Sequence, residues 1–267
     1  MDLVVTQKQA IATDTVSIRL AQQKGRPLPP FEPGAHIEVS VDGRRRRYSL
    51  TSKTDGGEYY EIRVLRARSS RGGSAFINET LQVGDIVSVE GPFSTFALNV
   101  DARHSVFIAG GIGITPFYTM IDSLRAADRL FELYYTAKTV GRRLPLPEGA
   151  AHARVYPTEG DGQGLDIAQL LPRLDTESDL YVCGPRTLIE AVRHGATGLG
   201  WPRHSIHFES FGYAAQPKDQ TIQVHLSQSK MTVDVQPGIP ILDALLEAGV
   251  WAPFECRRGN AAHVRLK

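Results

Sequence analysis

Short runs of alternating apolar and polar residues fill roughly the first hundred positions, which is the pattern of β-strands with one buried face. Turn-forming residues such as Gly34, Asp42-Gly43 and Gly84-Asp85 separate these runs. Strands at such regular spacing predict a closed or nearly closed antiparallel barrel, and residues 75–83 predict a short helix that covers one end. The predicted strands are residues 16–21, 36–41, 46–52, 60–66 and 86–93.

From residue 105 the pattern changes to apolar strands that alternate with helical stretches. This alternation predicts parallel βαβ units in a doubly wound α/β sheet. Strands are predicted at 105–110, 131–137, 179–184 and 205–211, and helices at 118–128, 166–174 and 185–200.

After residue 213 a polar stretch with a proline is typical of a linker, and a hairpin with a helix follows it. This last piece, about 50 residues, is too short to form a complete, well-buried domain. We therefore expect a barrel domain at 1–101, an α/β domain at 102–213, a linker at 214–221 and an incomplete small domain at 222–267.

Composition and charge are those of an ordinary globular protein, with 42% hydrophobic residues, 22% charged residues and a net charge of +1. A near-neutral chain has no general attraction to nucleic acid or membrane, so we expect neither as a partner. The sequence shows no long apolar span and no signal-peptide pattern, and it has two cysteines. These features favour a cytoplasmic location.

Glycines mark the end of the first α/β strand, in the segment FIAGGIGITPF at 107–117. Gly110, Gly111 and Gly113 let the backbone approach a ligand closely, and Thr115-Pro116 opens a helix. Free amides at a helix start suit a pyrophosphate. A tight turn without any ligand explains the glycines equally well.

The segment YVCGP at 181–185 has the same form, because an apolar strand delivers Cys183, Gly184 and Pro185 to a second helix start. Taken alone, Cys183 is better explained as a buried, inert thiol. Both glycine turns follow parallel strands, however, and open α/β sheets bind ligands at the carboxyl ends of their strands. Two such turns at one edge favour a nucleotide site.

A basic strand, RRRRYSLTS at 44–52, stands out in the barrel region. In a strand Arg46 and Tyr48 share one face, and Ser49 lies on the other. Arginine binds phosphate in a bidentate way and an aromatic ring offers a surface for a flat ligand, although a charge run is more often a solvated strand. The sequence RGGS at 71–74 adds glycine amides and a hydroxyl, so the barrel predicts a planar, phosphorylated ligand.

Five motifs in this order resemble the phthalate dioxygenase reductase-like branch of the ferredoxin–NADP reductase superfamily. They are RRYSL (46–50), RGGS (71–74), GGIGITP (110–116), YVCGP (181–185) and HFESF (207–211). The resemblance covers essentially the whole chain. It implies an FMN-binding barrel, an NADH-binding α/β domain and a C-terminal plant-type [2Fe-2S] ferredoxin domain of the β-grasp type, here only partial.

Residue roles follow from the same resemblance. Arg46 is expected to hold the FMN phosphate, Tyr48 to pack on the flavin, and Ser49 to lie near its reactive N5 edge. Ser49, Thr115 and Cys183 are the candidate catalytic residues. The other expected FMN contacts are Leu50, Ile62, Val64, Gly72, Gly73, Ser74 and Phe211, and the expected NAD contacts are Gly110, Gly111, Gly113, Thr115, Pro116, Cys183, Gly184 and Pro185.

Two cofactor choices remain. FMN is preferred to FAD because no clear platform for an adenine is visible between Ser74 and Phe93. The basic residues Lys138, Arg142 and Arg143 follow the second α/β strand, where they could meet the 2′-phosphate of NADPH or be solvated loop charges. The resemblance favours NADH.

The expected iron–sulfur ligands are incomplete. Plant-type clusters use C-x4-C-x2-C and a distant fourth cysteine. Cys256 occupies the first position, but Ala261 and Val264 occupy the next two. One thiolate does not hold a [2Fe-2S] cluster, so the resemblance implies a cluster that this sequence does not support.

The resemblance implies the reductase component of a Rieske-type aromatic oxygenase or demethylase, with the terminal oxygenase as partner. An FAD-dependent ferredoxin or flavodoxin reductase without an iron–sulfur centre is one alternative. A non-catalytic flavin-binding subunit that docks on another protein is the other.

Overall fold

The computed structural model describes residues 1–55, 57–67, 72–150, 153–158, 164–211, 220–227, 229–237, 241, 244–245 and 248–250. The chain divides into two compact units, Met1–Phe211 and Gly212–Lys267. The first contains a β-barrel and an α/β sheet, and the second contains a small hairpin.

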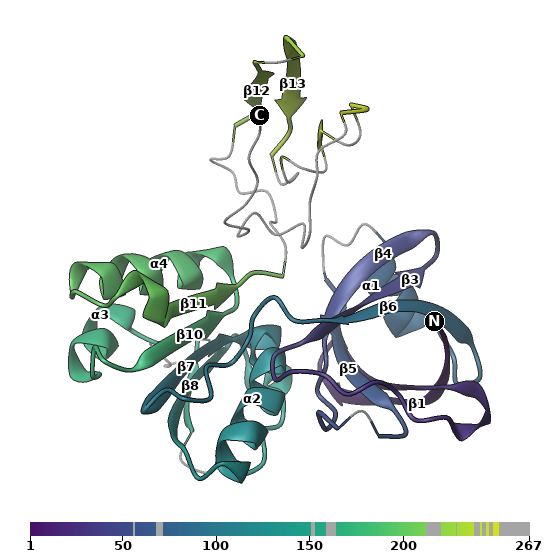
Figure 1. Cartoon of the computed structure of the whole chain (residues 1–267), viewed down its shortest axis with the longest axis horizontal. Coiled ribbons are helices and arrows are strands. Elements are labelled where there is room, and N and C mark those ends of the chain that lie inside the picture. Colours follow the sequence, from purple (N-terminus) through teal and green to yellow (C-terminus); the bar gives the residue numbers. More distant parts are fainter. Residues whose placement is uncertain are drawn as a thin grey trace. The chain divides into compact units, whose positions relative to one another are not determined.

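Six antiparallel strands form the barrel, in the spatial order β4-β3-β6-β1-β2-β5 (Figure 1). An antiparallel bridge between Leu50 and Ile62 joins the two edge strands, so the sheet closes. The predicted antiparallel barrel is therefore confirmed. Its strands are β1 (Asp2–Ala12), β2 (Thr15–Ala21), β3 (His36–Val41), β4 (Arg44–Ser49), β5 (Tyr60–Leu65) and β6 (Ile86–Phe93), with the 3-10 helix η1 (Gln23–Gly25) and helix α1 (Gly73–Glu79).

Strand β1 is not predicted by the hydrophobic pattern. Leu3 and Val5 are buried, but no residue of the strand beyond Val5 is fully buried. The apolar alternation that identifies a half-buried strand is therefore confined to its first few residues. Pairing with β2 and β6 places this long strand inside the sheet.

Five parallel strands form the second sheet, in the order β11-β10-β7-β8-β9. They are β7 (His104–Gly110), β8 (Leu130–Ala137), β9 (Arg154–Pro157), β10 (Asp179–Cys183) and β11 (Ile206–Glu209). The helices are α2 (Thr115–Ala126), α3 (Ile167–Leu170) and α4 (Arg186–Gly198), with 3-10 helices η2 (Gly111–Ile114), η3 (Val140–Arg142), η4 (Leu171–Arg173) and η5 (Arg203–Ser205).

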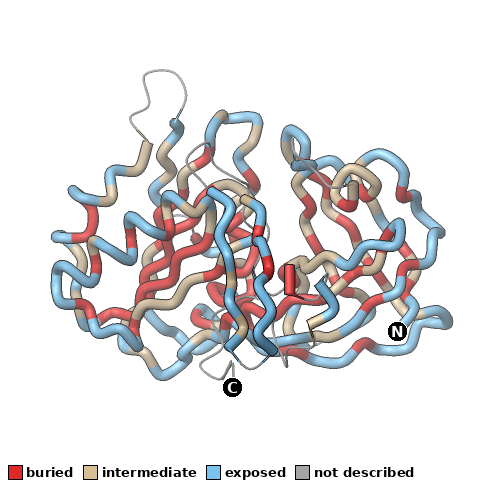
Figure 2. The backbone as a smooth tube through the Cα atoms, turned by 90° about the horizontal axis from the view of Figure 1, so that it is seen from above, coloured by how far each residue is buried: buried red, intermediate tan, exposed pale blue. Residues whose placement is uncertain are grey.

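Helices cover both faces of this sheet, as a doubly wound fold requires (Figure 1). Along β7, Phe107 and Ala109 pack in the cluster that contains α2, whereas Val106 and Ile108 pack in the cluster that contains α4. Figure 2 shows the buried residues concentrated along the strands of the two sheets. Strand β9 was not predicted, because its four residues at the sheet edge are too few to show a period.

The second unit is described only in part. Strands β12 (Ile222–Leu226) and β13 (Met231–Val235) form an antiparallel hairpin. Val233 and Val235 pack with Ala244 and Leu245 in a small apolar cluster. Most of the predicted linker and all residues from 251 onward lie outside the described residues. Among the described residues, no helix combines the length and apolar character needed to cross a bilayer.

Candidate functional site

Arg44, Arg45 and Arg47 of the basic strand β4 form ion pairs. Each of these guanidinium groups meets a carboxylate on β3, on β6 or in the turn before β4. The pairs are Arg44–Asp42, Arg45–Glu90 at 3.1 Å and Arg47–Glu38 at 2.7 Å. Much of the charge run is thus balanced locally.

The fourth arginine, Arg46, lies against the glycine turn at the start of α1. A Cβ atom added to Gly73 would be 3.0 Å from Cγ of Arg46, and one added to Gly72 would be 3.1 Å from Nη1 of Arg44. Gly72 also has a backbone φ of 104°, which residues other than glycine rarely adopt. The structure therefore brings together the two predicted phosphate-binding motifs.

The next two residues of the strand differ in burial. Tyr48 is half-buried against the barrel core, and burial raises its pKa to about 12 while the Arg46 guanidinium opposes that rise. Its phenol is therefore neutral beside a cation. Ser49 is buried, with 3% of its surface exposed, and its Oγ has no hydrogen-bond partner among the described residues. A buried hydroxyl of this kind points to an absent ligand or water.

Other predicted flavin contacts have different surroundings. The side chains of Leu50, Ile62 and Val64 belong to the barrel core, so these residues can meet a ligand only through their backbone. Ser74 Oγ accepts a hydrogen bond from the Ala67 amide at 3.2 Å. Phe211, the last residue of the first unit, is 40% exposed.

The two glycine turns of the α/β sheet lie in direct contact. A Cβ atom on Gly113 would be 2.2 Å from the Cys183 carbonyl oxygen. One on Gly110 would be 2.6 Å from Cδ of Pro185, and one on Gly184 would be 2.9 Å from Cα of Gly110. Close packing of the two strand ends therefore requires glycine at these three positions, with or without a ligand.

Gly111 is different, because its φ of 56° favours glycine while no atom lies within 4 Å of a Cβ added there. The backbone at Gly111 therefore has open space beside it, which a ligand could approach. Thr115 is buried, and its Oγ1 donates a hydrogen bond to the Ile112 carbonyl at 2.9 Å. With Pro116 in its first turn, α2 begins immediately after η2.

Cys183 is completely buried at the end of β10. A thiol without accessible surface behaves as a small apolar residue rather than as a reactive group. The Cys183 atoms closest to Gly113 are those of its backbone carbonyl, and not the thiol.

The barrel and the α/β sheet meet beside these residues. Strand β5, which contains the predicted FMN contacts Ile62 and Val64, contacts the predicted dinucleotide-binding turn η2. Across the same boundary Arg63 lies over the ring of Tyr118, with Cζ 3.8 Å from the ring centroid. Neither residue belongs to a recognisable sequence motif, so the sequence does not predict this pair.

Arg142, one of the basic residues that could bind the 2′-phosphate of NADPH, is paired with a carboxylate of the barrel. Arg142 forms an ion pair with Asp14 in the barrel turn between β1 and β2, and the Thr13 amide donates to the Gly141 carbonyl at 2.7 Å. Arg142 therefore links the α/β region to the barrel, and its charge is already paired with a carboxylate.

The positions predicted for the cluster ligands, Cys256, Ala261 and Val264, lie outside the described residues. Within the part of the chain that the structure describes, no group of three or more His, Cys, Asp or Glu residues could hold a metal ion.

Comparison with known proteins identifies relatives along almost the whole chain. Residues 2–98 match the family model described as "Oxidoreductase FAD-binding domain". The chain is 37% identical to a tetrachlorobenzoquinone reductase of Sphingobium chlorophenolicum, and the match covers 97% of this chain and 83% of the relative. It is 35% identical to a phthalate dioxygenase reductase of Burkholderia cepacia, with the same two coverages.

A solved phthalate dioxygenase reductase has a similar fold. It is described as a modular structure for electron transfer from pyridine nucleotides to [2Fe-2S], and it matches with a TM-score of 0.76 at 33% identity. The match covers 96% of this chain and 82% of that chain. From these identities and coverages we conclude that the chain belongs to the phthalate dioxygenase reductase-type family of flavin-dependent oxidoreductases.

Proposed function

We propose that this chain takes electrons from NADH through FMN and delivers them to a terminal oxygenase. The observation that carries this proposal is the contact between β5, on the flavin side, and η2, on the nucleotide side. Hydride transfer needs the two reacting atoms to approach within about 3–3.5 Å, and contact between the two binding elements allows such an approach.

The described residues fit a flavin phosphate and ring. Arg46 and the amides beside Gly73 would bind the phosphate, because a guanidinium and glycine amides supply charge-assisted hydrogen bonds. The half-buried Tyr48 would cover part of the ring, and the Ser49 hydroxyl would gain its missing partner. Bound FMN would supply the chemistry, since a flavin accepts a hydride and gives up electrons one at a time.

On the nucleotide side the open space beside Gly111 favours backbone contact with the dinucleotide. Thr115 would shape the first turn of α2, where amides are available to a pyrophosphate. Pairing of Arg142 with Asp14 supports NADH, because one cation that could meet a 2′-phosphate is already neutralised.

The acceptor is proposed from the relatives. The Burkholderia relative is by name the reductase of a dioxygenase, which supports a terminal oxygenase as partner. The sequence does not fit a plant-type cluster, because Ala261 and Val264 replace two ligands. We therefore expect that electrons do not pass through such a cluster in this chain. We also expect the reduced flavin to transfer electrons to artificial acceptors.

An anaerobic titration with NADH, followed by visible absorption and combined with an iron assay, tests the proposal. We expect flavin bands that bleach with NADH and no stoichiometric iron. A flavin that NADH does not bleach would contradict the reductase function, and stoichiometric iron with sulfide would contradict the absence of a cluster. Because the matching family model is described as FAD-binding, FAD is the alternative flavin, and mass spectrometry of the released flavin decides between the two.

The variant Arg46→Ala tests the flavin site directly. We expect FMN binding to weaken by about 1.5–3 kcal/mol, the range for a hydrogen bond to a charged group, in a fluorescence titration. Arg45→Ala is the matched control, because Arg45 forms an exposed ion pair with Glu90 and such pairs contribute little. Equal FMN affinity in the wild type and Arg46→Ala would remove Arg46 from the site.

A further inference from the structure

Arg63 and Tyr118 join the flavin-side strand to the nucleotide-side helix. Arg63 belongs to β5 and Tyr118 to α2, and the guanidinium carbon lies 3.8 Å from the ring centroid. The Arg63 side chain is only 15% exposed, so water screens this cation–π contact weakly. Burial raises the pKa of the Tyr118 phenol, although Arg63 opposes the rise, and the ring therefore stays neutral.

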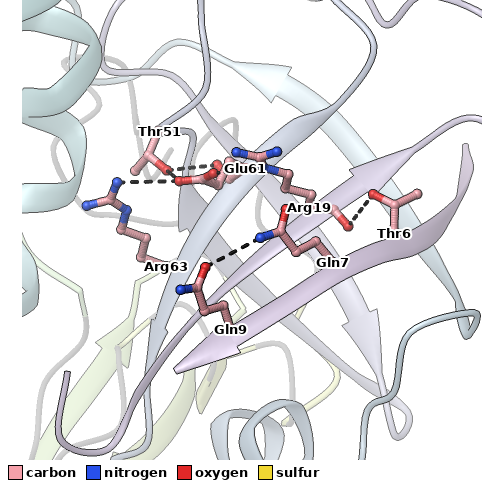
Figure 3. Close-up of polar contacts among 7 residues, drawn as sticks. All are labelled: Thr6, Gln7, Gln9, Arg19, Thr51, Glu61 and Arg63. Atoms are coloured by element: carbon pink, nitrogen blue, oxygen red, sulfur yellow. Dashed lines mark hydrogen bonds and ion pairs between the residues drawn. The ribbon is translucent and has the colours of Figure 1, made fainter. Parts of the chain in front are cut away.

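A carboxylate orients the guanidinium. Glu61, on the same strand, accepts from Nη2 of Arg63 at 3.4 Å and from Nε of Arg19 at 3.2 Å (Figure 3). The Thr51 hydroxyl donates to the same carboxylate at 3.2 Å. Contacts from three directions hold Glu61 in place, and Arg63 is thereby directed toward α2.

The next residue of α2 forms a second contact with the barrel. The Gly34 amide donates to Oγ1 of Thr119 at 2.9 Å, in a buried position. A Cβ atom on Gly34 would be 2.4 Å from Cε of Met120 on α2, so the barrel backbone approaches the helix closely here. Two consecutive residues, Tyr118 and Thr119, therefore fix α2 on the barrel.

The position of these contacts along α2 matters. The helix begins at Thr115, immediately after the turn η2, and Tyr118 lies within the first turn of the helix. A helix transmits a displacement of its side chains to its own N-terminus because its backbone is rigid over such a distance. The contact with Arg63 thus acts on the turn that the proposed function assigns to the dinucleotide.

We propose that Arg63 and Tyr118 are positioning residues that set how closely the nicotinamide approaches the flavin. This inference rests on the proposed function, because it requires both cofactors to bind. Neither residue need touch the reacting atoms. A small shift of α2 would misalign the two rings, and a misplacement of about 1 Å can lower a transfer rate by roughly 100-fold.

Tyr118→Leu, Tyr118→Phe and Arg63→Gln test the idea by stopped-flow reduction of the flavin at saturating NADH. Tyr118→Leu and Arg63→Gln should each slow the reduction by about 10- to 100-fold while the Kd values for flavin and NADH change less than about threefold. Tyr118→Phe keeps the ring and should keep the rate within about twofold. The double variant should be no slower than the slower single variant, because both changes break the same contact.

The visible absorbance of the flavin–nucleotide complex provides a second measurement. It should not change if the two residues only stabilise the fold. A nicotinamide ring stacked on a flavin gives a long-wavelength band, and Tyr118→Leu and Arg63→Gln should weaken it at saturating nucleotide. Arg193→Gln is the matched control, since it removes another cation–π contact, in which Arg193 of α4 lies 4.1 Å from the ring centroid of Phe208 on β11. We expect this control to keep both the band and the rate.

The outcomes separate the inference from the function on which it rests. If NADH does not bleach the wild-type flavin, the proposed function fails. If the wild type reacts and both Tyr118→Leu and Arg63→Gln react at its rate with an unchanged band, only the positioning role is overturned. If Tyr118→Leu does not fold, Arg63→Gln alone decides, because it removes the cation and leaves the half-buried ring in place.

Discussion

The Ser49 hydroxyl shows how much a single residue can indicate about a site. The strand pattern correctly separates Arg46 and Tyr48 from Ser49 by face, but it carries no information about hydrogen-bond partners. Only the structure shows that Ser49 is buried and that its Oγ has no partner among the described residues. Burying such a group is unfavourable, and a bound ligand or water that completes its hydrogen bonding would remove that cost.

Replacing Ser49 with alanine should separate stability from function. The free energy of unfolding of the flavin-free protein should stay the same or rise by up to about 1 kcal/mol in urea denaturation, because an unsatisfied buried hydroxyl is removed. Reduction of bound flavin by NADH should slow by roughly 10- to 100-fold if the hydroxyl takes part in the reaction. Ser105→Ala is the control, since Ser105 Oγ on β7 is also buried without a described partner. Equal reduction rates in the two variants would argue against a role for Ser49.

At the scale of elements, the glycine turns illustrate what a motif leaves open. The spacing of Gly110, Gly111 and Gly113 predicts a strand-to-helix turn, and the structure has one in η2. Sequence alone does not tell a glycine required by packing from one that leaves room for a ligand. The distinction depends on Cys183, which is far away in the sequence and adjacent in the sheet.

Alanine at Gly113 and at Gly111 should therefore have different effects. Gly113→Ala places a methyl group 2.2 Å from the Cys183 carbonyl and should lower the free energy of unfolding by about 1–3 kcal/mol, as overpacking does. Gly111→Ala meets no atom within 4 Å and should lose only about 1–2 kcal/mol from its positive φ. Its larger effect should be a higher Kd for NADH. Urea denaturation and a nucleotide titration measure the two quantities, and an unchanged Kd for NADH in Gly111→Ala would exclude nucleotide contact there.

For the whole molecule, the order of a barrel followed by a parallel sheet could be predicted, because each half shows its own hydrophobic period. The contacts that join the halves could not. Arg63, Tyr118, Asp14 and Arg142 are ordinary half-buried or loop residues in their local patterns, and their pairing arises only when distant segments meet. Local periodicity carries no signal for such long-range pairs.

Buried tyrosines give the whole fold a predictable response to alkaline pH. Tyr60 has no exposed surface, donates a hydrogen bond to the Pro29 carbonyl at 2.6 Å, and has its pKa raised by burial to about 12. In the unfolded chain a tyrosine has a pKa of about 10. Between these two values the unfolded state loses the proton first, so the free energy of unfolding must fall as the pH rises.

The contribution of Tyr60 to stability should be fully present below pH 10 and decline by up to about 2–3 kcal/mol as the pH rises toward 12. Tyr60→Phe should be less stable than wild type by about 1 kcal/mol at pH 8, because one hydrogen bond is lost. That difference should shrink and then reverse at higher pH, since phenylalanine does not ionise. Urea denaturation at pH 8, 9, 10 and 11 measures both curves. If they run parallel across this range, alkaline destabilisation arises at other groups, and the buried Tyr60 phenol does not control it.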